Sequence, residues 1–150
     1  MPAASLGRNR YSQEATTTDQ KIQTVHGMYE AFGRGDIEFI LDQLTEDVDW
    51  ASCPGSQIAP WHGIHRGKAE VPGFFKALAE NLDITEFTPL SFAANETDVM
   101  VVTHWAATAP ATGRSAAMDI HHWWRFRDGK IYFYRGTEDT AQTQELLRND

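Results

Sequence analysis

The chain has 150 residues, a formal net charge of −8 and a single cysteine, Cys53. This length suits one domain. An acidic chain without a Lys/Arg cluster is a poor partner for nucleic acids and for anionic membranes. A lone cysteine cannot form an intramolecular disulfide, and no run of about 18 apolar residues could span a membrane. We therefore expect a cytoplasmic location.

Residues 1–18 are predicted to be a flexible tail. The segment lacks the apolar stretch of a secretory signal. Its short length and Glu14 argue against a transit peptide. The folded domain is therefore expected over residues 19–150.

Three helices are predicted in the first half of the chain. After Thr18, apolar residues recur at steps of three and four, which is typical of a helix. Gly33 ends this helix, Asp36 can cap a second, and a third begins near Gly67. The three apolar stripes are Ile22, Val25, Tyr29 and Phe32; then Ile37, Ile40, Leu41 and Leu44; then Val71, Phe74, Phe75, Leu78 and Leu82.

Strands dominate the second half. A short extended segment at 48–51 and a loop rich in Pro, Gly and Ser at 52–67 precede the third helix. Asp128-Gly129 is a strong hairpin signal, and Asp139 or Thr140 can cap a short last helix. The predicted strands are 84–94, 98–108, 114–127 and 130–137. This order predicts an α+β fold, with helices on one face of a sheet and a ligand site between the layers.

Three stretches resemble the SnoaL-like branch of the nuclear-transport-factor-2-like superfamily. Residues 33–50 carry a helix end, a Gly-Asp restart and an acidic pair. Residues 63–78 match the family's entry to the third helix. Residues 123–147 match the family's F-x-D-G-K-I hairpin and the aspartate that follows it. The resemblance implies a cone-shaped barrel of three N-terminal helices packed on a strongly curved, mostly antiparallel sheet, with a short C-terminal helix.

The known catalytic residues of that superfamily are not kept. It includes ketosteroid isomerases, limonene epoxide hydrolases, polyketide cyclases, dehydratases and non-catalytic binders. The two acidic positions of the isomerases fall on Ser52 and His122. The arginine of the epoxide hydrolases falls on His104, and one of their aspartates on Gly136. Function therefore does not follow from the resemblance alone.

Strand alternation and the family register turn His122 and His104 toward the hollow. A histidine in an apolar pocket titrates near neutral pH and suits acid/base catalysis. A core histidine bonded to a neighbour is the alternative. The expected ligand-binding residues are Trp50, Ser52, Met118, Ile120, Trp124 and Tyr134.

The strand residues that alternate with these inward-facing positions point to the outer face of the sheet. Four of them carry large rings, which predicts a homodimer through this face. Family members also commonly pair through this face. The rings are those of Trp105, His121, Trp123 and Phe133.

No metal and no cofactor are expected. His62 and His65 lie in a loop, His121 and His122 point to opposite faces, and no paired cysteine motif accompanies them. Cys53 lies near the predicted pocket end without a partner evident in the sequence, so a small hydrophobic role is favoured.

The prediction is a cofactor-free acid/base enzyme of isomerase, cyclase, dehydratase or hydrolase type. Its substrate would be a small apolar cyclic or polyketide-like metabolite, with His122 and His104 carrying protons. The alternative is a non-catalytic small-molecule binding protein of the same fold. The missing carboxylates favour the binder, and the two histidines favour the enzyme.

Overall fold

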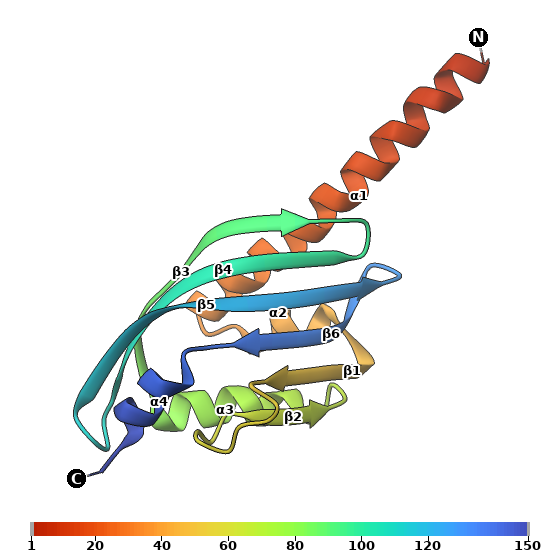
Figure 1. Cartoon of the computed structure of the whole chain (residues 1–150). Coiled ribbons are helices and arrows are strands. Elements are labelled where there is room, and N and C mark those ends of the chain that lie inside the picture. The colour runs from red at the N-terminus through yellow and green to blue at the C-terminus, as the bar shows by residue number, and fades with distance from the viewer. Residues whose placement is uncertain (1, 150) are drawn as a thin grey trace.

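The structure is a computed structural model that describes the backbone of residues 2–149 and the side chains of residues 18–149. Within this range it has four helices and six strands (Figure 1). The helices are α1 (Pro2–Gly33), α2 (Ile37–Asp42), α3 (Val71–Asn81) and α4 (Thr140–Leu147). The strands are β1 (Leu44–Ser52), β2 (Gly63–Arg66), β3 (Asp83–Ala94), β4 (Asp98–Ala109), β5 (Arg114–Arg127) and β6 (Lys130–Thr137). The predicted α+β class is confirmed.

The strands form one mixed sheet in the order β2-β1-β6-β5-β4-β3. Only β1 and β6 pair in parallel among these described strands, and all other neighbours are antiparallel. In this pairing Ser52 lies opposite Gly136, and Gly136 lies opposite His122 on β5. The ends of β1 and β6 and the middle of β5 therefore meet at one place.

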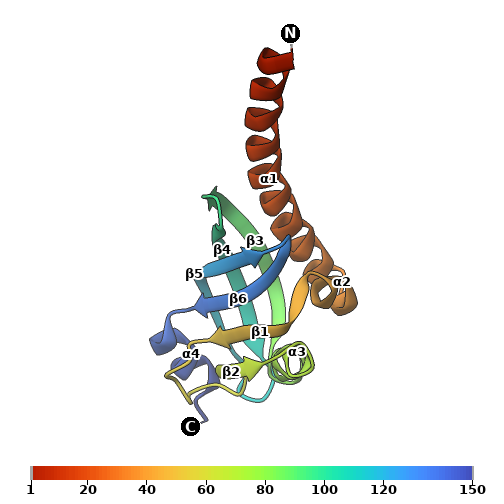
Figure 2. The same cartoon turned by 90° about the vertical axis from the view of Figure 1, so that its right-hand side faces the viewer.

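Helices α1, α2 and α3 lie on one face of the sheet (Figure 2). Helix α1 buries Val25, Met28 and Tyr29 against it, because residues three and four apart share one helical face. The helix begins at Pro2, well before Thr18, and its first half extends away from the sheet (Figures 1 and 2). The flexibility of residues 1–18 stays a prediction.

Single residues determine one turn and two helix starts. Asp36 caps α2 by accepting the Phe39 N–H at 3.1 Å, as predicted. Asp128 and Gly129 both adopt positive φ, at 52° and 79°, which two-residue hairpin turns require. Asp139 caps α4, because its side chain accepts the backbone N–H groups two and three residues further along the chain.

The loop predicted over 52–67 is partly wrong, because it contains β2. This strand has only four residues and pairs with the end of β1, with His65 opposite Trp50. Four residues are too few for an alternating pattern to stand out from the surrounding Pro and Gly.

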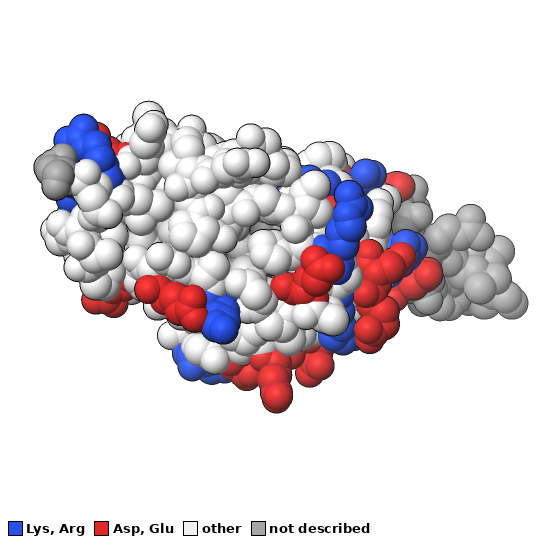
Figure 3. Space-filling view, turned by 90° about the horizontal axis from the view of Figure 1, so that it is seen from below, with Lys and Arg blue, Asp and Glu red and all other residues white. Residues whose placement is uncertain are grey.

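Charged side chains lie mainly at the margins of the face in Figure 3, and uncharged groups form its centre. Among the described residues, no helix is both long and apolar enough to cross a membrane.

Candidate active site

A cavity of about 90 Å³ lies between the helices and the sheet, and a ligand site there stays a prediction. Its lining comes from α1, α2, α3, the sheet and the segment after β6, and is mostly apolar and aromatic. Its hydroxyl, imidazole and carboxyl groups belong to Tyr29, Ser52, His122, Tyr134, Thr137 and Glu138. The cavity is smaller than the roughly 300 Å³ of a typical ligand pocket, because large rings fill most of the space between the layers.

Tyr29 and His122 form a buried polar pair in the cavity wall. The Tyr29 hydroxyl hydrogen-bonds His122 Nδ1, and the Trp124 indole N–H approaches the same hydroxyl at 3.4 Å. Burial, with a smaller contribution from the neighbouring His121, lowers the pKa of His122 to about 3. Burial also raises the pKa of Tyr29 well above its usual range. Both groups are therefore neutral near pH 7.

The neighbouring Trp124 favours one direction for this hydrogen bond. Because the Tyr29 oxygen accepts the Trp124 N–H, its own O–H is available to donate to Nδ1 of His122, and Nε2 then carries the ring hydrogen. No residue in the range 18–149 hydrogen-bonds this Nε2. The expectation that His122 titrates near neutral pH is thus wrong, because its environment is almost wholly apolar. His122 is instead a neutral hydrogen-bond donor.

Two further polar groups face the same aromatic cluster. The Trp50 ring lies 4.2 Å from that of Tyr134, which lies 4.4 Å from that of Trp124. The Trp50 indole N–H is buried and has no hydrogen-bond partner among the described residues. Buried donors normally find acceptors, so the indole N–H of Trp50 is an exception among the described residues.

Gly136 makes room for this cluster. A Cβ at Gly136 would overlap the Tyr134 hydroxyl and lie 3.4 Å from the His122 ring. The position that corresponds to an epoxide hydrolase aspartate is therefore closed to any side chain here.

The predicted ligand-binding residues Trp50, Ser52, Ile120, Trp124 and Tyr134 all line the cavity. Met118 is buried but is not among the lining residues.

The predicted orientation of β4 is wrong by one residue. Its buried side chains include Thr103 and Trp105, so Trp105 lines the cavity instead of facing outward. His104 is partly exposed on the outer face, 2.8 Å from Asp119 and 3.8 Å from Glu86. Apolar and small residues alternate weakly along β4, so the sequence offered no strong basis for choosing a face. His104 is therefore outside the cavity, beside the exposed Asp119.

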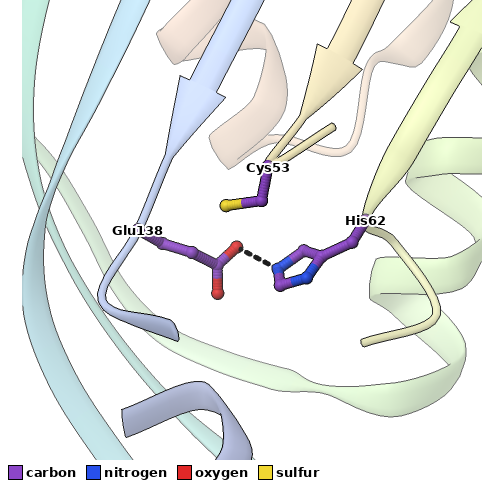
Figure 4. Close-up of side chains that lie close together, drawn as sticks. All are labelled: Cys53, His62 and Glu138. Carbon is purple, nitrogen blue, oxygen red and sulfur yellow. Dashed lines mark ion pairs between the residues drawn. The ribbon is translucent and has the colours of Figure 1, made fainter. Parts of the chain in front are cut away.

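A second buried polar cluster lies where β1 and β6 end, and sequence reasoning missed it (Figure 4). It consists of Cys53, His62 and Glu138. His62 Nε2 lies 3.0 Å from Glu138 Oε1, and the two side chains are 0% and 7% exposed. Cys53 is partly buried beside them. The three residues come from separate segments, and the pairing of β1 with both β2 and β6 brings them together.

Neighbouring donors hold Glu138 and His62 in place. The Trp61 indole N–H donates to Glu138 Oε1 at 2.9 Å, and the Thr143 hydroxyl donates to Oε2. On the other side of the ring, His62 Nδ1 lies 2.7 Å from the Ser56 hydroxyl.

The pKa of His62 in this cluster shifts in the opposite direction to that of His122. Burial disfavours the charged imidazole of His62, but Cys53 and Glu138 outweigh it and raise its pKa to about 9. Burial also disfavours the charged carboxylate of Glu138, yet the adjacent His62 imidazole and the hydrogen bonds from Thr143 and Trp61 lower its pKa. The carboxylate of Glu138 and the neighbouring Cys53 therefore favour the protonated, positively charged form of the His62 imidazole.

Solved structures share this fold over almost their full length. An NTF2-like protein of unknown function from Burkholderia pseudomallei is 29% identical, with a TM-score of 0.80, and covers 87% of this chain and 98% of its own. TerC, co-crystallised with polyporic acid, is 27% identical, with a TM-score of 0.78 and coverages of 87% and 99%. An LEH-like epoxide hydrolase from M. tuberculosis is 17% identical, with a TM-score of 0.67 and coverages of 87% and 92%, which shows the fold alone.

No curated protein sequence matches this chain. The family model of the SnoaL-like domain matches residues 25–134, from the buried face of α1 to the middle of β6. The chain therefore belongs to the SnoaL-like domain family and has the NTF2-like fold.

Proposed function

We propose that the protein is an acid/base enzyme that polarises an oxygen of a small, largely apolar ring molecule. The observation that carries this proposal is the buried Tyr29–His122 pair, whose Nε2–H has no acceptor among residues 18–149. The reaction is of isomerase, cyclase, dehydratase or hydrolase type, and polarisation of an oxygen by this pair needs no cofactor. We place the activity in the cytoplasm.

The pair supports this chemistry through its fixed, neutral donor. When a base removes a proton from the carbon beside a carbonyl, negative charge develops on the carbonyl oxygen, and a preorganised N–H in an apolar site stabilises that charge strongly. Glu138 is the carboxylate of the described lining that would take this proton. Tyr29 holds the imidazole in the tautomer that presents Nε2–H. A neutral imidazole also keeps its hydrogen at any pH above its low pKa.

The apolar lining favours a ring compound as the ligand. TerC, which is 27% identical to this chain, was crystallised with polyporic acid. At about 90 Å³ the cavity must widen to admit such a molecule. The rings of Phe75 and Phe87 line the cavity and are only partly buried, so they are the side chains we expect to move.

The second candidate is a non-catalytic binder, and one observation favours it. Among the cavity-lining residues within the described range, Glu138 is the one carboxylate. Its oxygens already accept hydrogen bonds from Trp61 and Thr143 and lie beside His62. If Glu138 acted as the general base, the substrate proton would have to compete with these partners for its oxygens.

Hydrogen exchange separates the two candidates even while the natural substrate is unidentified. Cyclic ketones are incubated with the protein in D₂O, and deuterium uptake beside the carbonyl is followed by NMR. Trp fluorescence quenching measures binding of the same compounds. We expect catalysed exchange, and a loss of about 10²–10³-fold in His122→Phe, which keeps a ring but removes the N–H donor, with binding retained.

His121→Gln is the matched control, because His121 is the preceding residue and faces outward. It should exchange at the wild-type rate. Binding without catalysed exchange for every ketone that binds would establish the binder instead.

A further inference from the structure

The cluster of Cys53, His62 and Glu138 offers three different metal-ligating atoms. A sulfur, a ring nitrogen and a carboxylate oxygen all lie within 4.8 Å of one another. Two ligands of a tetrahedral zinc ion lie roughly 3.3–3.7 Å apart, as follows from bond lengths of about 2.0–2.3 Å. A small inward shift of these side chains would therefore complete the ligand set.

The arrangement of the donors favours convergence on one point over a catalytic relay. In a nucleophilic Cys-His-acid triad, the two ring nitrogens contact different partners, the nucleophile and the acid. Here the carboxylate of Glu138 and the sulfur of Cys53 lie on the same side of the His62 ring (Figure 4). The other nitrogen, Nδ1, contacts Ser56 at 2.7 Å. An oxygen partner on the second nitrogen is the usual support of a metal-binding histidine.

The contact between His62 and Glu138 is also unsatisfactory as a hydrogen bond. Nε2 lies 3.0 Å from Oε1, but it is a buried atom without an aligned hydrogen-bond partner among residues 18–149. A buried ion pair is stabilising only when its geometry is good, because both charges lose their hydration. A cation between Nε2, the carboxylate and the thiolate would satisfy all three groups at once.

The backbone supports the position of the sulfur. Cys53 adopts a φ of 41°, a left-handed conformation that is unfavourable for a residue with a side chain. Its N–H donates to the Gly136 carbonyl at 2.9 Å, which fixes it against the end of β6, two residues before Glu138. Strain of this kind persists where the surrounding structure holds it, and it often marks a functional site.

We propose that Cys53, His62 and Glu138 form a binding site for a divalent metal ion of the zinc class. Thiolate and imidazole ligands favour zinc over magnesium or calcium. Three protein ligands leave a fourth position for water or a ligand oxygen. Glu138 lines the cavity, so the ion would lie at the cavity wall. The site uses other residues than the Tyr29–His122 pair and stands independently of the proposed function.

The test is metal binding by the full chain after chelator treatment. Co²⁺ is added and its absorption measured, since a cysteine ligand produces a thiolate-to-cobalt charge-transfer band in the near ultraviolet. Zn²⁺ is then titrated in competition. We expect one ion per chain, and loss of the charge-transfer band in Cys53→Ser. His62→Gln should weaken Zn²⁺ binding by more than about 100-fold, because even changes outside the ligand shell cost about 10–100-fold.

Two variants sharpen the result. Ser56→Ala keeps all three ligands and should weaken binding by about 10–100-fold. His65→Gln alters a histidine three residues from His62 that is outside the cluster, and should bind as the wild type does. Circular dichroism confirms that each variant is folded. Absence of stoichiometric uptake by the wild type, or equal binding by folded Cys53→Ser, would overturn the proposal.

Discussion

Two buried histidines beside one cavity have opposite protonation behaviour. His122 is held neutral, with a pKa of about 3, whereas the pKa of His62 is raised to about 9. Burial disfavours the charged imidazole in both. The partners differ, because His122 meets a tyrosine hydroxyl and aromatic rings, and His62 meets a carboxylate and a thiol. The charge of a buried histidine therefore follows from its nearest acid, and burial alone does not predict it.

Removing the acid beside His62 should have the largest effect on stability. In the chelator-treated protein, Glu138→Gln leaves His62 buried without its counter-charge, and we expect a loss of about 3 kcal/mol in the free energy of unfolding. Urea titration measures it. Asp119→Asn removes the acid beside the partly exposed His104 and should change stability by less than about 0.5 kcal/mol. Equal losses in the two variants would show that burial of the pair has no influence.

Gly136→Ala should disturb the His122 region and leave the His62 cluster unchanged. The added methyl group overlaps the Tyr134 hydroxyl and crowds the His122 ring, so we expect a loss of about 1–3 kcal/mol. Thermal unfolding followed by circular dichroism measures this change. Gly33→Ala is the control, because its Cβ would meet nothing within 4 Å. A Gly136→Ala protein as stable as the wild type would mean that the aromatic cluster can rearrange freely.

The pH dependence of stability should reveal the neutral state of His122. The unfolded chain takes up a proton at this residue below about pH 6.5, but the folded protein does so only near pH 3. Stability from this group is therefore complete above about pH 6.5 and declines as the pH falls toward 3. The decline is at most about 1.4 kcal/mol per pH unit. Urea titrations across this range should show a shallower decline for His122→Gln, and parallel curves would contradict the low pKa.

The outer sheet face carries a third histidine environment, around His121. The homodimer stays a prediction, now with His121, Trp123 and Phe133 as its patch because Trp105 is buried. Light scattering at micromolar concentration should give twice the chain mass, and Trp123→Ser should reduce it to one chain. Ile58→Ser changes an exposed apolar residue in the loop between β1 and β2 and should leave the mass unchanged. A wild-type monomer would refute the dimer.

The sequence predicted the elements well because their signals are local. Asp36, Asp128-Gly129 and Asp139 each act within a few residues of backbone, and each works as predicted. The position of His122 in the cavity followed from the alternation along β5, which is regular through Met118, Ile120 and Trp124.

What the sequence could not predict depends on distant contacts. The face of β4 was assigned wrongly because small residues such as Ala106 and Ala107 fit either side. The pKa of His122 depends on how completely other elements enclose it. Cys53, His62 and Glu138 are neighbours through the pairing of β1 with β2 and β6, and no motif indicates either pairing. A histidine next to tryptophan in a Pro- and Gly-rich loop was the one weak signal.

The parallel pairing of β1 with β6 also sets when the protein can begin to function. During synthesis, β1 is made early but has only the four residues of β2 beside it until β6 has left the ribosome. Its other edge is exposed during that time, and exposed strand edges promote misassociation. Closing the sheet between residues so far apart along the chain is also slow. The His62 cluster therefore forms late, and a chain truncated before β6 would contain both histidines but would lack Tyr134 beside His122 and Glu138 beside His62.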